Sequence, residues 1–254
     1  TTEWIIAKTG IKRRYHVAAD ETATSMAMQA SENAIARAAI ETKEIGLVMV
    51  ASFSQDYLFP PLSAKIHSLL SLPKACQILD INTNCVGLVT ALTIASERMQ
   101  HDDTIKYALV IGVEVLSKFT DQKDQDTSIF FSDGAAAVIL GKVKDGYGYS
   151  SAKFLTDSST FESVRMRAGG SSFPANSQSA DSKAYFSRQR GSGAQKQAVT
   201  NHPLVINNLL EKEKMKVDDI DFFIFHQANG FLIDYILKKM KIPLTKTYTN
   251  VEEI

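Results

Sequence analysis

The sequence has few cysteines, no net charge and no long apolar run, and each absence excludes a class of protein. Its 254 residues include only Cys76 and Cys85, too few for a disulfide framework and consistent with a reducing compartment. Basic and acidic residues number 28 each, so net charge points neither to nucleic acid nor to an anionic membrane. No apolar run approaches the roughly 20 residues of a membrane span, and the opening TTEWIIAKTG lacks the layout of a signal peptide. We therefore expect a soluble, cytoplasmic protein.

Apolar residues make up 44% of the chain, enough for one large domain or two ordinary ones. Short apolar runs predict strands at Gly46–Ala51, Ala75–Ile81, Tyr107–Val113, Ala135–Leu140 and Ile220–Phe225. Helical spacing predicts helices at Glu21–Thr42, Leu62–Leu72, Val86–Met99, Gln195–Leu210 and Phe231–Met240. Pro203 should kink or restart the fourth of these helices. Helices that alternate with fully apolar strands predict an α/β fold whose sheet is covered on both faces.

Composition divides the chain near Asp145–Tyr149, where Gly and Tyr accumulate, so we expect one half at 1–145 and another at 146–254. The Ser- and Gly-rich stretch Ser158–Arg190 is expected to be a long surface insertion. The second half resembles the first. In each half a long helix precedes, and another helix follows, the tract ETKEIGLVMVAS or KVDDIDFFIFHQA, and Ile45 matches Ile220 by position. Such self-similarity indicates two related α/β halves. Chance similarity between two generic helix–strand units is the alternative.

Cys85 lies where an apolar strand meets a helix, in ACQILDINTNCVGLVTAL. At a helix start, unpaired amide groups and the helix dipole favour an anion, so we expect a lowered thiol pKa and a reactive thiolate. Gly87 would let another group approach the backbone closely. The competing interpretation is a buried structural cysteine. Cys76, which lies inside the apolar run, fits that structural role better.

His226 follows the apolar run FFIF and precedes Gln227-Ala228-Asn229. It is therefore expected at the carboxyl end of a strand, where open α/β sheets bind their ligands. A histidine in this place is often structural. If two related halves bring both strand ends to the base of one active site, however, Cys85 would be the nucleophile. His226 would then be its acid/base partner or an oxyanion donor.

Trp4, the only tryptophan, is followed closely by Lys8, Lys12, Arg13 and Arg14. One interpretation is a ring at the edge of the core beside a solvated basic loop. The other is a ring that stacks on a nucleotide base while the cations meet its phosphates.

Five stretches in the same order resemble the β-ketoacyl-acyl-carrier-protein synthase III family of the thiolase superfamily. They are EWIIAKTGIKRR, LDINTNCVGLVTAL, YALVIGVEVLSK, IFFSDGAAAVILG and DDIDFFIFHQAN. The HQAN tract distinguishes this family from other condensing enzymes. The resemblance implies a thiolase-like five-layer αβαβα fold made of two duplicated halves, and a homodimer.

The resemblance also implies a Cys-His-Asn triad in which Cys85 takes an acyl group from coenzyme A. His226 would assist decarboxylation of a malonyl group on an acyl carrier protein. The family's asparagine lies beyond TYTNVEEI, where this sequence stops, and the family's first and last strands also have no counterpart here. No permanently bound cofactor and no metal ion are implied, since a coenzyme A thioester is a substrate.

Further positions acquire expected roles through the same resemblance. Trp4 would stack on the adenine of coenzyme A, Asn229 would contact its pantetheine arm, and Phe59 would close the acyl pocket of a partner subunit. Gln125 and Phe231 replace two arginines of the family, which removes planar cationic contacts to coenzyme A. Basic residues that rim the tunnel mouth and would meet an acidic carrier protein are Lys196, Lys238 and Lys239.

Three functions are consistent with these residues. The first is an initiating condensing enzyme of fatty-acid synthesis. The second is a related acyltransferase of specialised metabolism with another donor or nucleophile, which Gln125 and Phe231 keep open. The third is a non-catalytic partner subunit, against which the joint presence of Cys85 and HQAN argues.

Overall fold

The computed structural model describes residues 2–175, 182–189 and 193–253, and the chain forms two compact units. Unit 1 comprises Thr1–Tyr15, Ser117–Ser132 and Ser151–Ile254, and unit 2 comprises His16–Leu116 and Asp133–Ser150. The assignment of 1–145 and 146–254 as two family halves stays a prediction. Within the described residues, no helix combines the length and apolarity needed to cross a membrane.

Unit 2 is built on a four-stranded sheet with the order β2-β1-β3-β4. Its strands are β1 (Ile45–Ala51), β2 (Gln77–Ile81), β3 (Tyr107–Glu114) and β4 (Gly134–Gly141). The pairs β1–β2 and β1–β3 are parallel, whereas β4 runs antiparallel to β3. Four of the predicted strands are therefore confirmed to within two residues at each end.

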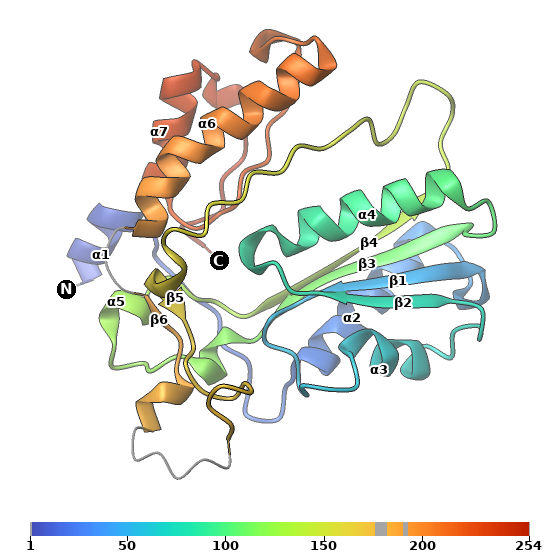
Figure 1. Cartoon of the computed structure of the whole chain (residues 1–254), viewed down its shortest axis with the longest axis horizontal. Coiled ribbons are helices and arrows are strands. Elements are labelled where there is room, and N and C mark those ends of the chain that lie inside the picture. The colour runs from blue at the N-terminus through green and yellow to red at the C-terminus, as the bar shows by residue number, and fades with distance from the viewer. Residues whose placement is uncertain (1, 176–181, 190–192, 254) are drawn as a thin grey trace. The chain divides into compact units, whose positions relative to one another are not determined.

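Helices cover both faces of this sheet, as Figure 1 shows. On one face α2 (Ala23–Ala38) and α3 (Leu62–Leu69) pack on alternate residues of the strands, among them Val48 and Ile111. On the other face α4 (Gly87–His101) packs on the intervening residues, among them Met49 and Val110. The continuous apolar runs of β1 and β3 are thus explained, because both faces of these strands are buried.

The helix predicted at Glu21–Thr42 is shorter at both ends, because local hydrogen bonds terminate it. The Thr22 side chain accepts a bond from the N–H of Ser25, and the Ser25 hydroxyl accepts one from the N–H of Thr22 in return, a capping box. At the other end Ala39 adopts a left-handed conformation with φ 51°, which stops the helix after Ala38.

Unit 1 contains the remaining elements. They are α1 (Thr2–Thr9), α5 (Gln125–Ser128), α6 (Gly193–Glu213), α7 (Gly230–Met240), β5 (Val164–Arg165) and β6 (Arg188–Gln189). Its core joins Ile11 and Phe225 to the buried face of α7, which presents Ile233, Ile236 and Leu237. The helix predicted at Gln195–Leu210 is confirmed as part of α6, a single assigned helix that contains Pro203.

The strand predicted at Ile220–Phe225 is wrong. Phe223 forms only an isolated bridge to Thr247, and Ile224 is 88% exposed. A strand is stabilised by pairing along its length, and the described part of the chain supplies one bridged partner here. Apolar composition cannot distinguish a paired strand from an extended segment.

The expected insertion Ser158–Arg190 holds regular structure in its described part. Strands β5 and β6 pair antiparallel within it, and Ala168 and Ala184 are buried. Residues 176–181 and 190 of this stretch lie outside the described residues.

The similarity around Ile45 and Ile220 is present in the backbone. After α2 the chain passes through left-handed Ala39 to a 3-10 turn at Thr42–Glu44, and the N–H of Ile45 donates to the carbonyl of Thr42. After α6 it passes through Lys214, with φ 57°, to a 3-10 turn at Val217–Asp219, and the N–H of Ile220 donates to the carbonyl of Val217. The two segments therefore share one local conformation.

Candidate active site

Cys85 lies between the carboxyl end of β2 and the start of α4, as the sequence predicts. The connection turns at Asn84, which has a left-handed φ of 51°, and continues through a single 3-10 turn at Asn84–Val86. Asparagine tolerates this conformation better than most residues. A Cβ atom at Gly87 would lie 3.1 Å from the Cβ of Ala51, so glycine allows α4 to start close to β1.

The carboxyl ends of the parallel strands lie at the same edge of the sheet as Cys85. The N–H of Ser52, just after β1, donates to the carbonyl of Ile81 at the end of β2. At the end of β3, the carboxyl group of Glu114 accepts bonds from the N–H of Phe53 and the hydroxyl of Ser54. The Ser54 oxygen accepts the N–H of Val115 at 2.8 Å.

Glu114 is a site residue that the sequence analysis missed. The available signal was a charged residue at the end of the apolar run YALVIGVE. Burial raises the pKa of the Glu114 carboxyl group to about 7, although its hydrogen bonds from Ser54 and Phe53 favour the charged form.

The thiol pKa of Cys85 is raised, opposite to the direction expected from the helix start alone. The largest cause is desolvation by surrounding protein, and the negative charge of Glu114 adds to it. The residue nevertheless has an exposed surface, so its partial desolvation does not prevent access. Cys76 is buried, and burial raises the pKa of its thiol to about 11. Of the two thiols, Cys85 is the accessible one.

In unit 1, His226 is held by its neighbours in the HQAN tract. The Gln227 side chain donates to the carbonyl of Phe225 and accepts the N–H of Asn250 at 3.1 Å. Asn229 is the N-cap of α7, because its Oδ1 accepts the N–H of Phe231 at 2.9 Å. The tract is therefore fixed on both sides of His226.

The pKa of His226 is lowered, mainly by desolvation and additionally by the positive charge of His202. A neutral imidazole is thus favoured near pH 7. Its side chain can then act as a neutral hydrogen-bond donor or acceptor.

Trp4 is exposed on α1, which packs against α7. The end of α1 approaches the start of α7 closely, since a Cβ atom at Gly230 would lie 3.6 Å from the carbonyl oxygen of Thr9. The structure therefore brings the helix of Trp4 beside the helix that follows HQAN. An exposed ring in this place remains able to stack on a ligand.

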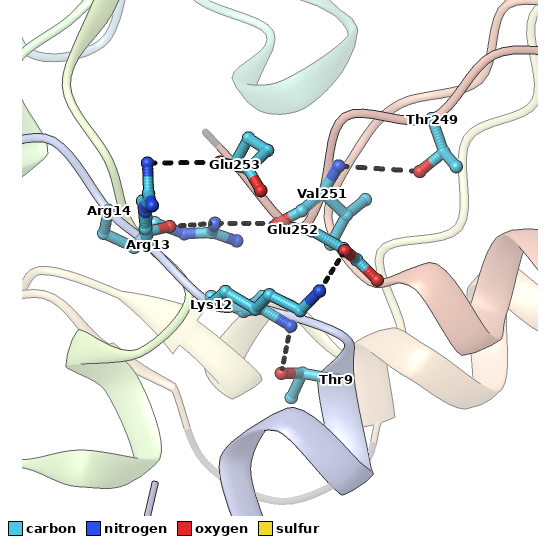
Figure 2. Close-up of polar contacts among 9 residues, drawn as sticks. Thr9, Lys12, Arg13, Arg14, Thr249, Val251, Glu252 and Glu253 are labelled. Atoms are coloured by element: carbon cyan, nitrogen blue, oxygen red, sulfur yellow. Dashed lines mark hydrogen bonds and ion pairs between the residues drawn. The ribbon is translucent and has the colours of Figure 1, made fainter. Parts of the chain in front are cut away.

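The basic cluster after Trp4 is largely engaged within the protein. Figure 2 shows that Lys12 pairs with Glu252 and that Arg13 pairs with Glu253. The second pair joins Nη1 of Arg13 to Oε2 of Glu253 at 3.4 Å. Arg14 donates to the carbonyl of Val251 at 3.2 Å. These contacts favour a structural role for Lys12, Arg13 and Arg14 over the predicted contact with phosphates. Lys8 is exposed.

The remaining predicted residues are all on the surface. Phe59 is 83% exposed in the loop before α3, and Phe231 is exposed in the first turn of α7. Gln125, Lys196, Lys238 and Lys239 are also exposed. Cys85 and Phe59 belong to unit 2, whereas the other residues predicted for the site belong to unit 1. Within the described part of the chain, no group of His, Cys, Asp and Glu residues is arranged to hold a metal ion.

Comparisons with known proteins agree on one family. A family model described as 3-oxoacyl-[acyl-carrier-protein (ACP)] synthase III matches residues 79–158, and the model of its C-terminal part matches residues 210–254. A beta-ketoacyl-[acyl-carrier-protein] synthase III of Natranaerobius thermophilus is 37% identical, over 98% of this chain and 76% of its own length.

Solved structures show the same similarity. The 3-oxoacyl-[acyl-carrier-protein] synthase III of Aquifex aeolicus has a TM-score of 0.87 and 30% identity, over 99% of this chain and 76% of its own. The priming beta-ketosynthase from the R1128 polyketide biosynthetic pathway has a TM-score of 0.88 and 26% identity, over 100% of this chain and 74% of its own.

Proposed function

Because the chain belongs to the 3-oxoacyl-[acyl-carrier-protein] synthase III family, we propose that it forms its acyl-enzyme on Cys85. The protein is an acyltransferase of thiolase-like fold, a condensing enzyme of fatty-acid initiation. The observation that carries the assignment of Cys85 is its exposed position between the end of β2 and the start of α4. Attack of its thiolate on a thioester carbonyl forms the acyl-cysteine and expels the thiolate of coenzyme A, which takes up a proton from solvent.

In the second step, a malonyl thioester on an acyl carrier protein loses carbon dioxide, and the electron pair of the broken bond forms an enolate. We assign stabilisation of the enolate oxygen to the neutral side chain of His226, whose lowered pKa supports this role. The enolate carbon attacks the acyl-cysteine, forms the new carbon–carbon bond and expels the Cys85 thiolate. These steps use the electrons of the substrates, so we expect no resident cofactor.

Coenzyme A is the proposed acyl donor, with Trp4 stacking on its adenine ring. The side-chain oxygen of Asn229 caps α7, so its amide NH₂ is the group that would donate to the pantetheine arm. We propose that Gln125 and Phe231 lie beside the same ligand. Neither side chain supplies a cation, so we expect weaker binding of coenzyme A than in relatives with arginine.

We also propose that the exposed lysines Lys196, Lys238 and Lys239 bind the acidic carrier protein. Lys196 lies on α6 and the other two on the last turn of α7, and these helices pack together. An exposed cationic surface accelerates association with an acidic partner. We place the enzyme in the cytoplasm, which agrees with two free cysteines.

A homodimer is supported by an open apolar edge in unit 2. Strand β2 lies at the edge of its sheet and exposes Ile78 and Leu79. The exposed residues Tyr57, Leu58 and Phe59 form a second apolar surface in the same unit. Exposed apolar edge strands tend to pair with another chain. Phe59 is accordingly proposed to close the acyl pocket of the partner subunit.

The alternative is a priming or acyl-transfer role in specialised metabolism. It is favoured by Gln125 and Phe231 and by the similarity to the priming ketosynthase of a polyketide pathway. This alternative uses the same Cys85 and differs in donor or acceptor. A non-catalytic subunit would form no acyl adduct.

Intact-protein mass measurement after incubation with acyl-coenzyme A and acyl-carrier thioesters tests these proposals together. We expect one acyl adduct in the wild type and in Cys76→Ser, and none in Cys85→Ser. Preference for short acyl-coenzyme A would support fatty-acid initiation, whereas acylation only by carrier thioesters would support the alternative. An adduct that persists in Cys85→Ser would contradict the site assignment.

A further inference from the structure

Polar groups join the ends of three strands in unit 2, at the sheet edge that carries Cys85. The N–H of Ser52, just after β1, donates to the carbonyl of Ile81 at the end of β2 at 3.1 Å. Ser54, further along the same loop, is hydrogen-bonded to Glu114 at the end of β3. The loop after β1 therefore links the strand that leads to Cys85 with the strand that ends at Glu114.

The carboxyl group of Glu114 holds this loop through both of its oxygens. One oxygen accepts the N–H of Phe53 at 3.2 Å, and the other accepts the hydroxyl of Ser54. The Ser54 oxygen in turn accepts the N–H of Val115 at 2.8 Å. The Ser54 hydroxyl is buried, so a loop that moved away would leave several buried polar groups without partners.

The turn that carries Cys85 packs against the start of the same loop. A Cβ atom at Gly87 would lie 3.1 Å from the Cβ of Ala51, the last residue of β1. Ser52 follows Ala51 directly, and its bond to Ile81 holds the chain before Cys85. Because the contacts are close, a displaced loop would move the backbone both before and after Cys85.

Joining these strand ends does not by itself require a carboxyl group. Desolvation raises the pKa of Glu114 to about 7, so its burial disfavours the charged form. That charge also raises the pKa of the Cys85 thiol. Apolar contacts could join the strands without these costs, since removing both partners of a buried hydrogen bond is often nearly neutral. Carboxyl groups with such raised pKa values cluster at functional sites.

We propose that Glu114 is a positioning residue for the acylation of Cys85 and acts through Ser54 and the loop after β1. This inference rests on the proposed function, because it concerns the same acyl-enzyme. The carboxyl group makes no bond to the substrate. It fixes the loop, and the loop fixes the turn that presents the thiolate to the thioester carbonyl. Misplacing a reacting group by about 1 Å can slow a reaction by about 100-fold.

Two substitutions remove the contact in different ways. Ser54→Ala deletes the bridging hydroxyl and keeps the carboxyl group. Glu114→Gln places an NH₂ group where one of the two acceptor oxygens was, so one donor, from Phe53 or Ser54, loses its acceptor. Each variant should lower the maximal rate of acylation by acyl-coenzyme A about tenfold, while the half-saturating concentration changes less than about twofold. Intact-protein mass measured over time gives both quantities.

The matched controls are Ser68→Ala and Glu32→Gln, which make the same chemical changes at exposed positions of unit 2. Both should be acylated at the wild-type rate. Circular dichroism confirms that each variant is folded, and the two test variants report on the same contact independently.

Iodoacetamide alkylation of Cys85 at pH 8 separates positioning from charge. This small reagent needs a thiolate but no bound orientation. Glu114→Gln should raise the alkylation rate, because the negative charge of Glu114 disfavours the thiolate. The same variant should lower the acylation rate, so the two rates should move in opposite directions. Neither a general loss of structure nor the charge alone produces this combination.

Acylation of either variant at the wild-type rate would overturn the proposal. An increase of both acylation and alkylation in Glu114→Gln would overturn it as well, since charge alone would then explain the effect. In both cases the wild type still forms its adduct on Cys85, and the proposed function stands. Absence of any adduct on Cys85 in the wild type would instead overturn the proposed function, and this inference with it.

Discussion

The hydroxyl group of Ser54 donates a hydrogen bond to the carboxyl group of Glu114, and the Ser54 oxygen accepts the N–H of Val115. The contact ties the loop after β1 to the end of β3. Both ends lie at the sheet edge that carries Cys85, and the charge of Glu114 acts on the thiol. The Ser54–Glu114 hydrogen bond therefore holds the backbone at this edge and also positions the charge that raises the thiol pKa of Cys85.

Glu114→Gln should change how stability depends on pH. The carboxyl pKa is raised from 4.5 to about 7 in the folded protein, so unfolding releases a proton between these values. The free energy of unfolding of the wild type therefore falls as pH rises from about 4.5 to 7, whereas the glutamine variant lacks this decrease. The difference amounts to about 3 kcal/mol at roughly 1.4 kcal/mol per unit. Urea unfolding across this range measures it.

Glu32→Gln, at an exposed carboxylate on α2, controls for the loss of one negative charge. Parallel stability curves for wild type and Glu114→Gln would show that Glu114 keeps an ordinary pKa.

The same substitution should make Cys85 more reactive above about pH 7, where the carboxyl group of Glu114 carries its charge. The negative charge of Glu114 raises the thiol pKa, so its removal lowers that pKa and moves the alkylation profile to lower pH. Iodoacetamide labelling of Cys85, followed by peptide mass analysis between pH 6 and 10, measures the profile. Glu32→Gln again serves as control. A profile that moves to higher pH, or does not move, would contradict the proposed interaction.

Gly87→Ala should destabilise unit 2. The added Cβ would lie 3.1 Å from the Cβ of Ala51, and two packed backbones must then separate. Overpacking of this kind costs roughly 1–3 kcal/mol, which urea unfolding would detect. The matched control is Gly134→Ala, because a Cβ there has no neighbour within 4 Å in the described structure. We expect the control to change stability by less than about 0.5 kcal/mol. Equal stability of both variants would show that α4 tolerates the methyl group.

His202→Gln should raise the pKa of His226. The positive charge of His202 disfavours the imidazolium form of its neighbour, so its removal makes protonation easier. Glutamine preserves a polar side chain on α6. NMR titration of the His226 ring carbons would give the direction of the change, with His101→Gln on α4 as the control. Desolvation alone would determine the pKa if the substitution had no effect.

Charge reversal at Lys238 and Lys239 tests the carrier-protein surface. The double variant Lys238→Glu and Lys239→Glu should slow the reaction with carrier-bound malonyl by about tenfold or more at low salt and weaken its salt dependence. Self-acylation by a small thioester should change little. Lys65→Glu with Lys74→Glu makes the same charge change on exposed residues of unit 2. If the carrier-dependent rate responds neither to salt nor to the charge reversal, these lysines do not bind the carrier protein.

The sequence by itself determined the elements whose stability is local. Apolar runs located β1 and β3, helical spacing located α7, and the stretches around Cys85 and HQAN indicated the family. The repeat that pairs Ile45 with Ile220 was also visible, because the turn before each residue depends on side chains within four positions.

Only the tertiary structure decided the features that depend on distant neighbours. The run Ile220–Phe225 has the composition of a strand, yet pairing is decided by residues elsewhere in the chain. The pKa of Cys85 rises because Glu114 and surrounding protein outweigh the helix start. Ser54 and Glu114 meet only because β1 and β3 pair in the sheet. Desolvation, charge–charge interaction and strand pairing all depend on distance in space, which sequence separation does not give.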